Sequence, residues 1–161
     1  MRRTDKADPS GENRDDRSAE RLLEKMAEDS RVLQMKKYVQ HGKVSTYDHC
    51  RKVADLSCGL NRHMHLHADP GTLVQGAMLH DYYLYDWHHK DGGTHDWHGF
   101  IHAEKASANA KRDFDVDEKV QDVIRSHMWP LNLSRLPRSR EAWIVCIADK
   151  CVSLQETIFR R

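Results

Sequence analysis

Residues 142–150 read AWIVCIADK, a run of apolar side chains followed directly by Asp149 and Lys150. The run belongs to a segment, residues 140–158, whose length and pattern predict a helix. Because the run is apolar on nearly every side of that helix, we expect the helix to lie at the centre of the fold. A buried carboxylate costs several kcal/mol unless it meets a cation or strong donors. Asp149 therefore indicates a buried polar site.

The sequence on the N-terminal side of this run also follows helical spacing. Apolar residues recur at steps of three and four from Ser18 to a stop at Gly42, and again in four further segments. No convincing alternation of a β-strand is present. The pattern predicts an all-α fold, a compact bundle of about six to seven helices. The predicted helices cover residues 18–42, 46–65, 72–80, 102–113, 117–128 and 140–158.

The length of 161 residues suits one domain. Residues 1–18 carry five basic and five acidic residues and almost nothing apolar, so we expect a disordered polar leader. Residues 19–161 then form a single helical domain. Within it, residues 82–101 are rich in His and aromatic residues and are interrupted by Gly92 and Gly93, which predicts a loop or lid.

The composition excludes several classes of protein. Lys and Arg number 26 against 25 Asp and Glu, which argues against a general nucleic-acid binder. No apolar run reaches the length of about 18 residues that a membrane span needs, and the N-terminus lacks the apolar centre of a signal peptide. We therefore expect a cytoplasmic chain. The four cysteines include no CxxC pair, which argues against a zinc ribbon.

Histidine is unusually frequent, with 12 in 161 residues. A single His on an apolar face is as a rule a hydrogen-bonded core residue, and Asp149 alone could pair with a Lys or Arg. Here, however, inward-facing His residues recur on four predicted helices, and Asp81 follows one of them directly. Imidazoles with carboxylates are typical ligands of Fe, Mn, Zn, Co or Ni, and the absence of thiolates argues against a structural zinc site. The four inward-facing histidines are His49, His80, His102 and His127.

The order His49, His80-Asp81, Asp149 resembles the H…HD…D signature of the HD-domain phosphohydrolase superfamily. The stretches YDHCRKVA (47–54), MLHD (78–81) and DK (149–150) are similar to three of its sequence elements. His102 and His127 lie where the binuclear subgroup, which includes the HD-GYP and cyclic-nucleotide phosphodiesterases, has ligands of a second metal. The resemblance covers about residues 40–157. The chain resembles small stand-alone bacterial HD-domain hydrolases more closely than it resembles the HD-GYP proteins.

The resemblance implies a hydrolase with divalent transition-metal ions (Fe, Mn, Ni, Co or Zn), two of them by likeness to the binuclear subgroup. The first ion would be held by His49, His80, Asp81 and Asp149. Asp81 would bridge to a second ion at His102 and His127. The ions would lower the pKa of a shared water, and the hydroxide formed would attack phosphorus. The expected substrate is a phosphomonoester or phosphodiester of a nucleotide or another small molecule.

Further site residues follow from the same resemblance. Asp81 and Lys52 are the expected catalytic residues, and Arg51 and Lys52 are expected to hold the phosphate of the substrate. Tyr82 and His98 are expected substrate contacts from the segment that follows the HD pair, where aromatic faces could stack a nucleobase and a His could protonate a leaving oxygen. The alternative is a packed loop that only covers the core.

The sequence also departs from the HD-GYP pattern. Tyr82-Tyr83-Leu84 follow the HD pair in place of the IGK of HDIGK, Met128 stands where a second His is usual, and a GYP element is absent. A cyclic dinucleotide is therefore not the expected substrate. Three other functions stay open: a di-iron oxygenase, a regulatory module that binds a nucleotide or metal without turnover, and a purely structural helical domain. The number of metals and the oligomeric state, including a homodimer through the N-terminal helices, stay open too.

Overall fold

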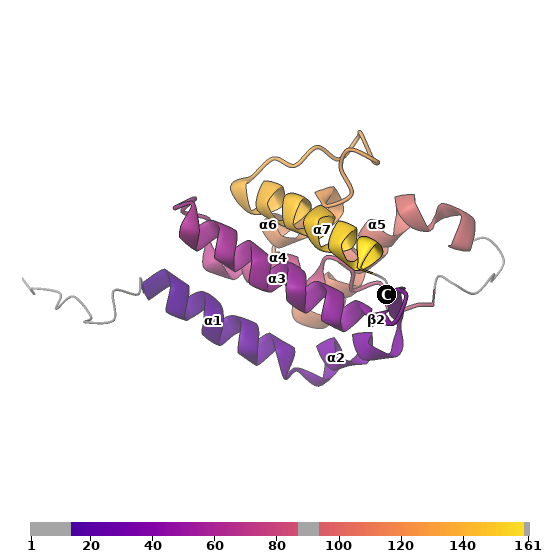
Figure 1. The fold of residues 1–161 in the computed structure, drawn as a ribbon, viewed down its shortest axis with the longest axis horizontal. Coiled ribbons are helices and arrows are strands. Elements are labelled where there is room, and N and C mark those ends of the chain that lie inside the picture. Colours follow the sequence, from indigo (N-terminus) through magenta and orange to yellow (C-terminus); the bar gives the residue numbers. More distant parts are fainter. Residues whose placement is uncertain (1–13, 87–93, 160–161) are drawn as a thin grey trace, which may run out of the picture.

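The computed structural model describes residues 14–86 and 94–159, and of residues 94–100 the backbone alone. In these residues the chain forms seven α-helices, one 3₁₀ helix and two short strands (Figure 1). The expected all-α bundle of six to seven helices is confirmed. The elements are α1 (Arg14–Ala27), α2 (Ser30–Leu33), η1 (Gln34–Lys37), β1 (Val39–His41), β2 (Val44–Ser45), α3 (Thr46–His63), α4 (Pro70–Leu79), α5 (Thr94–Phe114), α6 (Glu118–Ser126) and α7 (Arg140–Ile158).

Four of the long helices begin at a capping side chain. In each, the oxygen of a Ser or Asp accepts a hydrogen bond from the backbone N–H three residues further on, which satisfies a donor that the helix itself leaves free. Pro70 follows the cap of α4, where its fixed φ angle suits the first turn. The caps are Ser45 of α3, Asp69 of α4, Asp117 of α6 and Ser139 of α7.

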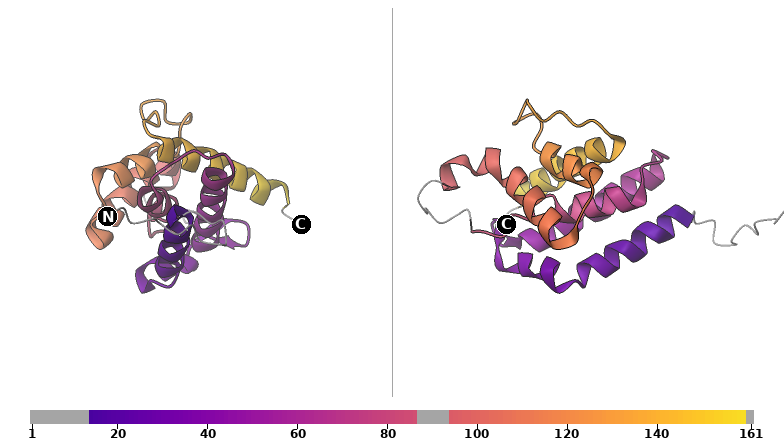
Figure 2. Two further views of the ribbon diagram at one scale, coloured as in Figure 1. Left: turned by 90° about the vertical axis from the view of Figure 1, so that its left-hand side faces the viewer. Right: turned by 180° about the vertical axis from the view of Figure 1, so that it is seen from behind.

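The centre of the bundle is α4, whose sequence PGTLVQGAML contains no charged residue. It contacts α1, α3, α6 and α7, and Figures 1 and 2 show α1 and α7 at opposite edges with α3 and α4 between them. The expectation that the 140–158 helix is central is therefore wrong, because α7 exposes a row of apolar side chains that includes Ile147 and Leu154. Because α4 is central, the HD pair at its end lies inside the molecule.

A glycine sets the close approach of α4 to α6. A Cβ atom added at Gly76 would lie 2.5 Å from Cγ1 of Val123 on α6, a distance that real side chains do not adopt. The two helices end near each other, and the ring centroids of His80 and His127, one at each end, are 4.8 Å apart. Gly76 therefore helps to bring two of the expected ligands together.

The predicted helix over residues 18–42 is wrong in both its bounds and its continuity. The helical region begins at Arg14, so residues 14–18 of the expected leader belong to α1, whereas residues 1–13 lie outside the described part. Asp29 caps a new helix after α1 ends. Residues 39–45 form an antiparallel β1–β2 pair that turns at Gly42, which adopts a φ of 61°. The sequence predicts no strands, and this prediction is wrong for one short hairpin.

The predicted loop over residues 82–101 is shorter than expected. Residues 82–86 are not helical, but α5 already begins at Thr94. Residues 87–93 and the side chains of residues 94–100 lie outside the described part, and these include the expected substrate contact His98. Within the described residues, the helices lack the combination of length and hydropathy that crossing a membrane requires.

Candidate metal centre

Six side chains from five segments of the chain converge on one buried cluster. The end of α4 supplies two of them, and α3, α5, the end of α6, and α7 supply one each. None of the six is more than 7% exposed. The structure therefore brings together every residue for which the sequence suggests a role as a metal ligand. They are His49, His80, Asp81, His102, His127 and Asp149.

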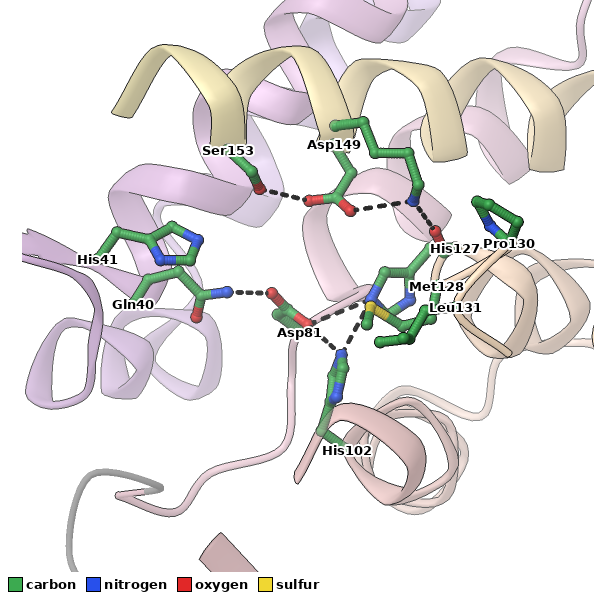
Figure 3. Close-up of a pocket in the computed structure, with 11 residues that line it drawn as sticks. Gln40, His41, Asp81, His102, His127, Met128, Pro130, Leu131, Asp149 and Ser153 are labelled. Atoms are coloured by element: carbon green, nitrogen blue, oxygen red, sulfur yellow. Dashed lines mark hydrogen bonds and ion pairs between the residues drawn. The ribbon is translucent and has the colours of Figure 1, made fainter. Parts of the chain in front are cut away.

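Asp81 lies between two pairs of imidazoles. Its Oδ2 is 3.5 Å from Nε2 of His80 and 3.8 Å from Nε2 of His49. Its Oδ1 is 3.3 Å from Nε2 of His102 and 3.5 Å from Nε2 of His127, as Figure 3 shows. This buried Oδ1 accepts no well-aligned hydrogen bond from the described residues. Each carboxylate oxygen thus faces its own pair of nitrogen donors, an arrangement that suits a carboxylate shared by two cations.

The positions of two histidines at helix ends fix their orientation. Nδ1 of His80 donates to the carbonyl of Ala77 at 2.7 Å, and Nδ1 of His127 donates to the carbonyl of Ile124 at 2.6 Å. Both carbonyls belong to a last helical turn, where backbone acceptors lack partners within the helix. With the proton of the neutral ring held on Nδ1, the lone pair of Nε2 points into the cluster, as in metal-binding histidines.

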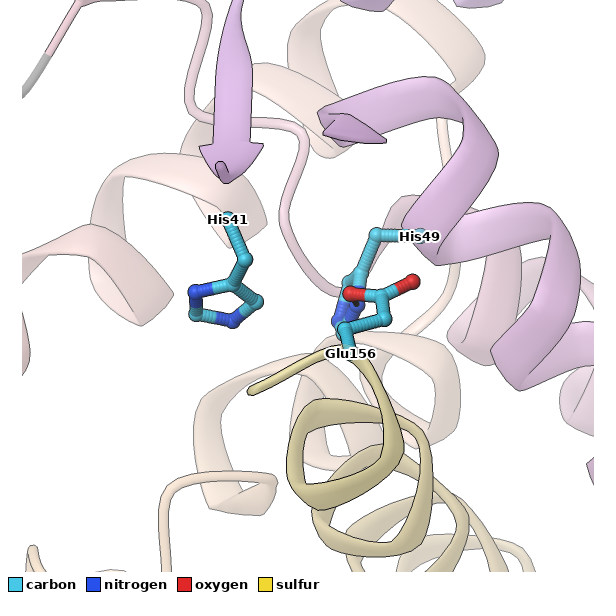
Figure 4. A group of neighbouring side chains, drawn as sticks. All are labelled: His41, His49 and Glu156. Carbon is cyan, nitrogen blue, oxygen red and sulfur yellow. Dashed lines mark hydrogen bonds and ion pairs between the residues drawn. The ribbon is translucent and has the colours of Figure 1, made fainter. Parts of the chain in front are cut away.

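His49 is oriented by the carboxylate of Glu156, a residue not expected at the site from the sequence. Its Nδ1 donates to Oε2 of Glu156 at 3.0 Å, and Oε1 of the same buried Glu156 accepts from Nζ of Lys52 at 3.0 Å. Figure 4 shows His49 and Glu156 beside His41, which lies at the end of β1. The signal was available, because Glu156 follows Asp149 by seven residues and therefore shares its helix face.

The distances between nitrogens indicate a place for cations. Nε2 of His80 lies 3.3 Å from Nε2 of His49, and Nε2 of His102 lies 3.1 Å from Nε2 of His127. Two lone pairs at such a distance repel each other unless a proton or a metal ion lies between the rings or beside them. Imidazole nitrogens and carboxylate oxygens without thiolates are the donor set of Fe, Mn, Co, Ni or catalytic Zn. The residues present therefore fit divalent transition metals.

The pKa values of the cluster residues show how strongly the buried carboxylates and imidazoles interact. Burial raises the pKa of Asp81, but the neighbouring His80, His102 and His127 outweigh it and hold this pKa well below its usual range. Burial lowers the pKa of His49, but its hydrogen bonds to Asp149 and Glu156 raise it to about 10. The pKa of His80 is raised as well, whereas burial lowers that of His127, so His49 and His80 supply the positive charge that the buried carboxylates require in the metal-free protein.

A cleft of about 570 Å³ opens onto the cluster. Asp81, His102, His127 and Asp149 line it (Figure 3). Nε2 of Gln40, from β1, donates to Oδ2 of Asp81 at 2.6 Å. The remaining lining residues are His41, Met128, Pro130, Leu131, Lys150 and Ser153.

The expected phosphate-binding cations do not line this cleft. Arg51 lies on the surface, where it pairs with Glu24 and Asp55, because two residues after His49 correspond to about 200° around the helix. Lys52 is half-exposed and pairs with Glu156 behind His49. Among the described lining residues, Lys150 is the only Lys or Arg. Its Nζ donates to the carbonyl of His127 at 2.6 Å and lies 3.8 Å from Oδ2 of Asp149.

Tyr82 is not among the described residues that line the cleft either. Its ring is fully buried and packs edge-on against Phe114, and its hydroxyl donates to Asp113 at 2.9 Å. The residue therefore anchors the segment after α4 to α5. Gln40, in contrast, lines the cleft but was not expected there. The sequence predicts a helix at this position and gives no reason to place the Gln40 amide beside Asp81.

Comparison with known proteins yields one family. A sequence model of the family described as HD domain matches residues 46–154. The match begins at the first residue of α3 and includes all six residues of the cluster. No curated protein and no solved structure matches the chain significantly.

Proposed function

The chain belongs to the HD-domain family of metal-dependent phosphohydrolases, and we propose that it hydrolyses a phosphomonoester or phosphodiester of a nucleotide or another small molecule. The observation that carries this proposal is the position of Asp81, whose two oxygens face two separate pairs of imidazole nitrogens. That arrangement supports a binuclear centre within the family.

By the distances between their donor atoms, the proposed ligands divide into two sets that share Asp81. His49, His80 and Asp149 would complete the first set, and His102 and His127 the second. Bound there, two divalent ions would lower the pKa of a shared water and offset charge on a phosphoryl oxygen. Gln40 would help to hold Asp81 in the orientation that this sharing needs, through its hydrogen bond to Oδ2.

The cleft supports a small substrate. Its volume of about 570 Å³ lies in the range of small-molecule sites. Met128, Pro130 and Leu131 form an apolar wall on one side, against which an ester group could pack. Lys150 is placed to attract the phosphate, since its ammonium lines the cleft next to Asp149. We therefore assign to Lys150 the role that the sequence suggests for Arg51 and Lys52.

A direct test is turnover of p-nitrophenyl phosphate and bis(p-nitrophenyl) phosphate by the untagged protein, supplied in turn with Mn²⁺, Fe²⁺, Co²⁺, Ni²⁺ and Zn²⁺. We expect release of p-nitrophenolate with at least one ion. Asp81→Asn should abolish it, because the neutral amide cannot bridge two cations. Arg51→Met is the matched control and should keep full activity, since Arg51 pairs with Glu24 and Asp55 away from the cleft.

Measurements of nucleotide binding and of oxygen dependence on the same protein separate the alternatives. Metal binding with tight binding of a nucleotide but no turnover of these esters or of nucleotides would identify a regulatory module instead. Turnover that needs O₂ and iron would identify an oxygenase. Equal activity of the parent and Asp81→Asn would overturn the assignment of the site.

A further inference from the structure

α7 exposes large apolar side chains on its outer face, although most of the residues on its inner face are apolar too. Its inner face carries the buried Asp149 and Glu156, which belong to the cluster and its surroundings. Its outer face carries large apolar side chains with high exposure, up to 62% for Ile158. The row consists of Trp143 (37% exposed), Ile147 (50%), Leu154 (60%) and Ile158, with the exposed Cys151 between them. We call these five residues the α7 stripe.

The α7 stripe is narrow and straight. At 100° per residue its members lie within about 80° of arc. Successive members are separated by three or four residues, the spacing with which one helix packs along another. In Figure 1 α7 lies on the near side of the bundle, and it packs inward against α3, α4 and α6. The stripe thus has the pattern of a helix–helix contact on a face that points away from the helices of its own chain.

The α7 stripe is also nearly symmetric about its own middle, between Lys150 and Cys151. Ile147 and Leu154 lie at equal distances on either side, and so do Trp143 and Ile158. If two copies of α7 run antiparallel about a two-fold axis, Ile147 of one copy meets Leu154 of the other, and Trp143 meets Ile158. The antiparallel arrangement also places the positive N-terminal end of each helix next to the negative C-terminal end of the other.

The exposed area is large enough for the apolar centre of a dimer. With roughly 100 Å² exposed by each half-exposed large side chain, the four apolar members present on the order of 400 Å² per chain. A standard interface buries about 800 Å² per partner and has an apolar centre inside a polar rim. The exposed Gln155 and Thr157 flank the stripe and would belong to that rim.

We propose that the α7 stripe is the interface of a homodimer in which α7 pairs antiparallel with α7 of a second copy. Cys151 then lies close to Cys151 of that copy, next to the two-fold axis. The dimer forms through the C-terminal helix rather than through the N-terminal helices.

The experiment is the mass of the full chain by sedimentation equilibrium across micromolar concentrations. The parent should have the mass of two chains, and the double variant Ile147→Asp, Leu154→Asp should have the mass of one. Both positions are at least half exposed, so circular dichroism should show an unchanged helical fold. Leu133→Asp is the matched control, because Leu133 is 76% exposed outside the stripe and its substitution should leave the dimer intact.

A second readout tests whether Cys151 lies next to the two-fold axis. A short bismaleimide should link two parent chains through Cys151, and Cys151→Ser should abolish the link. Burial raises the pKa of Cys58 to about 11, so its thiolate is scarce at neutral pH and contributes little. A monomeric parent, a dimer that survives the double aspartate variant, or a cross-link that persists in Cys151→Ser would each overturn the proposal.

Discussion

Glu156 links the half-exposed Lys52 to His49 of the cluster through two hydrogen bonds. It accepts from Nδ1 of His49 and from Lys52, so its charge fixes the ring and makes Nε2 a stronger donor. We expect Glu156→Gln to lower the affinity for Mn²⁺ or Co²⁺ by about 10- to 100-fold, the usual effect of removing such a carboxylate. Isothermal titration calorimetry of the metal-free protein measures it.

A matched control separates this effect from a general loss of charge. Glu28→Gln removes one carboxylate from an exposed position and should leave the affinity unchanged. Glu156→Asp keeps the charge but shortens the side chain, and it should restore part of the affinity. An unchanged affinity in Glu156→Gln would show that Glu156 does not act through His49.

Lys150 provides a second prediction at the scale of the residue. A phosphomonoester dianion carries more charge than a phosphodiester monoanion, so loss of the ammonium should affect the monoester more. We expect Lys150→Met to raise KM for p-nitrophenyl phosphate by about tenfold, equivalent to roughly 1.4 kcal/mol, and for the diester by less. Lys52→Met should leave the KM of both esters unchanged, because Lys52 does not line the cleft. The reverse order of effects would restore Lys52 as the phosphate contact.

Single residues show what sequence pattern can and cannot predict about the site. The four histidines of the cluster could be selected because each shares a helix face with apolar neighbours, a property that spacing alone reveals. Asp81 could be selected because it follows His80 directly, and Asp149 because it follows an apolar run. The roles of Arg51, Lys52 and Tyr82 rest on proximity in the chain, and direction around the helix or contacts with distant segments decide them instead. Gln40 depends on a hairpin that five strand residues form, too few to produce a recognisable alternation.

The contact between α4 and α6 is the feature of the elements that positions the site. Gly76→Ala would place a methyl group against Val123, and overpacking of this kind costs about 1–3 kcal/mol. Because this contact also holds His80 near His127, we expect weaker metal binding together with a lower free energy of unfolding. Urea denaturation of the metal-free protein measures the stability, and calorimetry measures the binding.

A compensating variant makes this prediction specific. Val123→Ala removes the atoms that the new methyl group would meet, so the double variant should be more stable than the sum of the two single changes predicts. Strict additivity of the two changes would contradict a steric contact at this position.

Helix boundaries were predictable where capping residues and prolines mark them. The last helix covers residues 140–158 both in the prediction and in the structure, and Ser139 caps it. Its place in the bundle was not predictable in the same way. A run that is apolar on all sides can mean burial on all sides, but here one apolar face is exposed and α4 holds the centre. The segment 94–101 was missed because Gly92 and Gly93 and the many His residues suggested an extended loop.

For the whole molecule, we expect the cluster to make stability depend on metal. It draws ligands from α3, α4, α5, α6 and α7, so ions bound there bind the folded chain in preference to the unfolded one. An ion at about 100 times its Kd adds about 2.7 kcal/mol, and 1 kcal/mol shifts Tm by about 2–4 °C in a chain of this size. We therefore expect chelation to lower Tm by at least about 5 °C, as followed by circular dichroism.

The control for this shift is Asp81→Asn, in which chelator should change Tm much less because neither set of ligands is complete. Restoring Mn²⁺ or Co²⁺ to the parent after removal of the chelator should restore its Tm. Equal Tm values with and without chelator in the parent would contradict a site that joins five helices.

The most direct test of the binuclear centre is the metal content of the untagged chain, purified without chelator and reconstituted with one transition metal at a time. Elemental analysis should find two equivalents of Fe, Mn, Co, Ni or Zn per chain. It should find at most one in His102→Ala, which removes a ligand of the second set alone. A parent that binds no metal, or one ion that His102→Ala leaves in place, would contradict the assignment of Asp81 as a shared ligand.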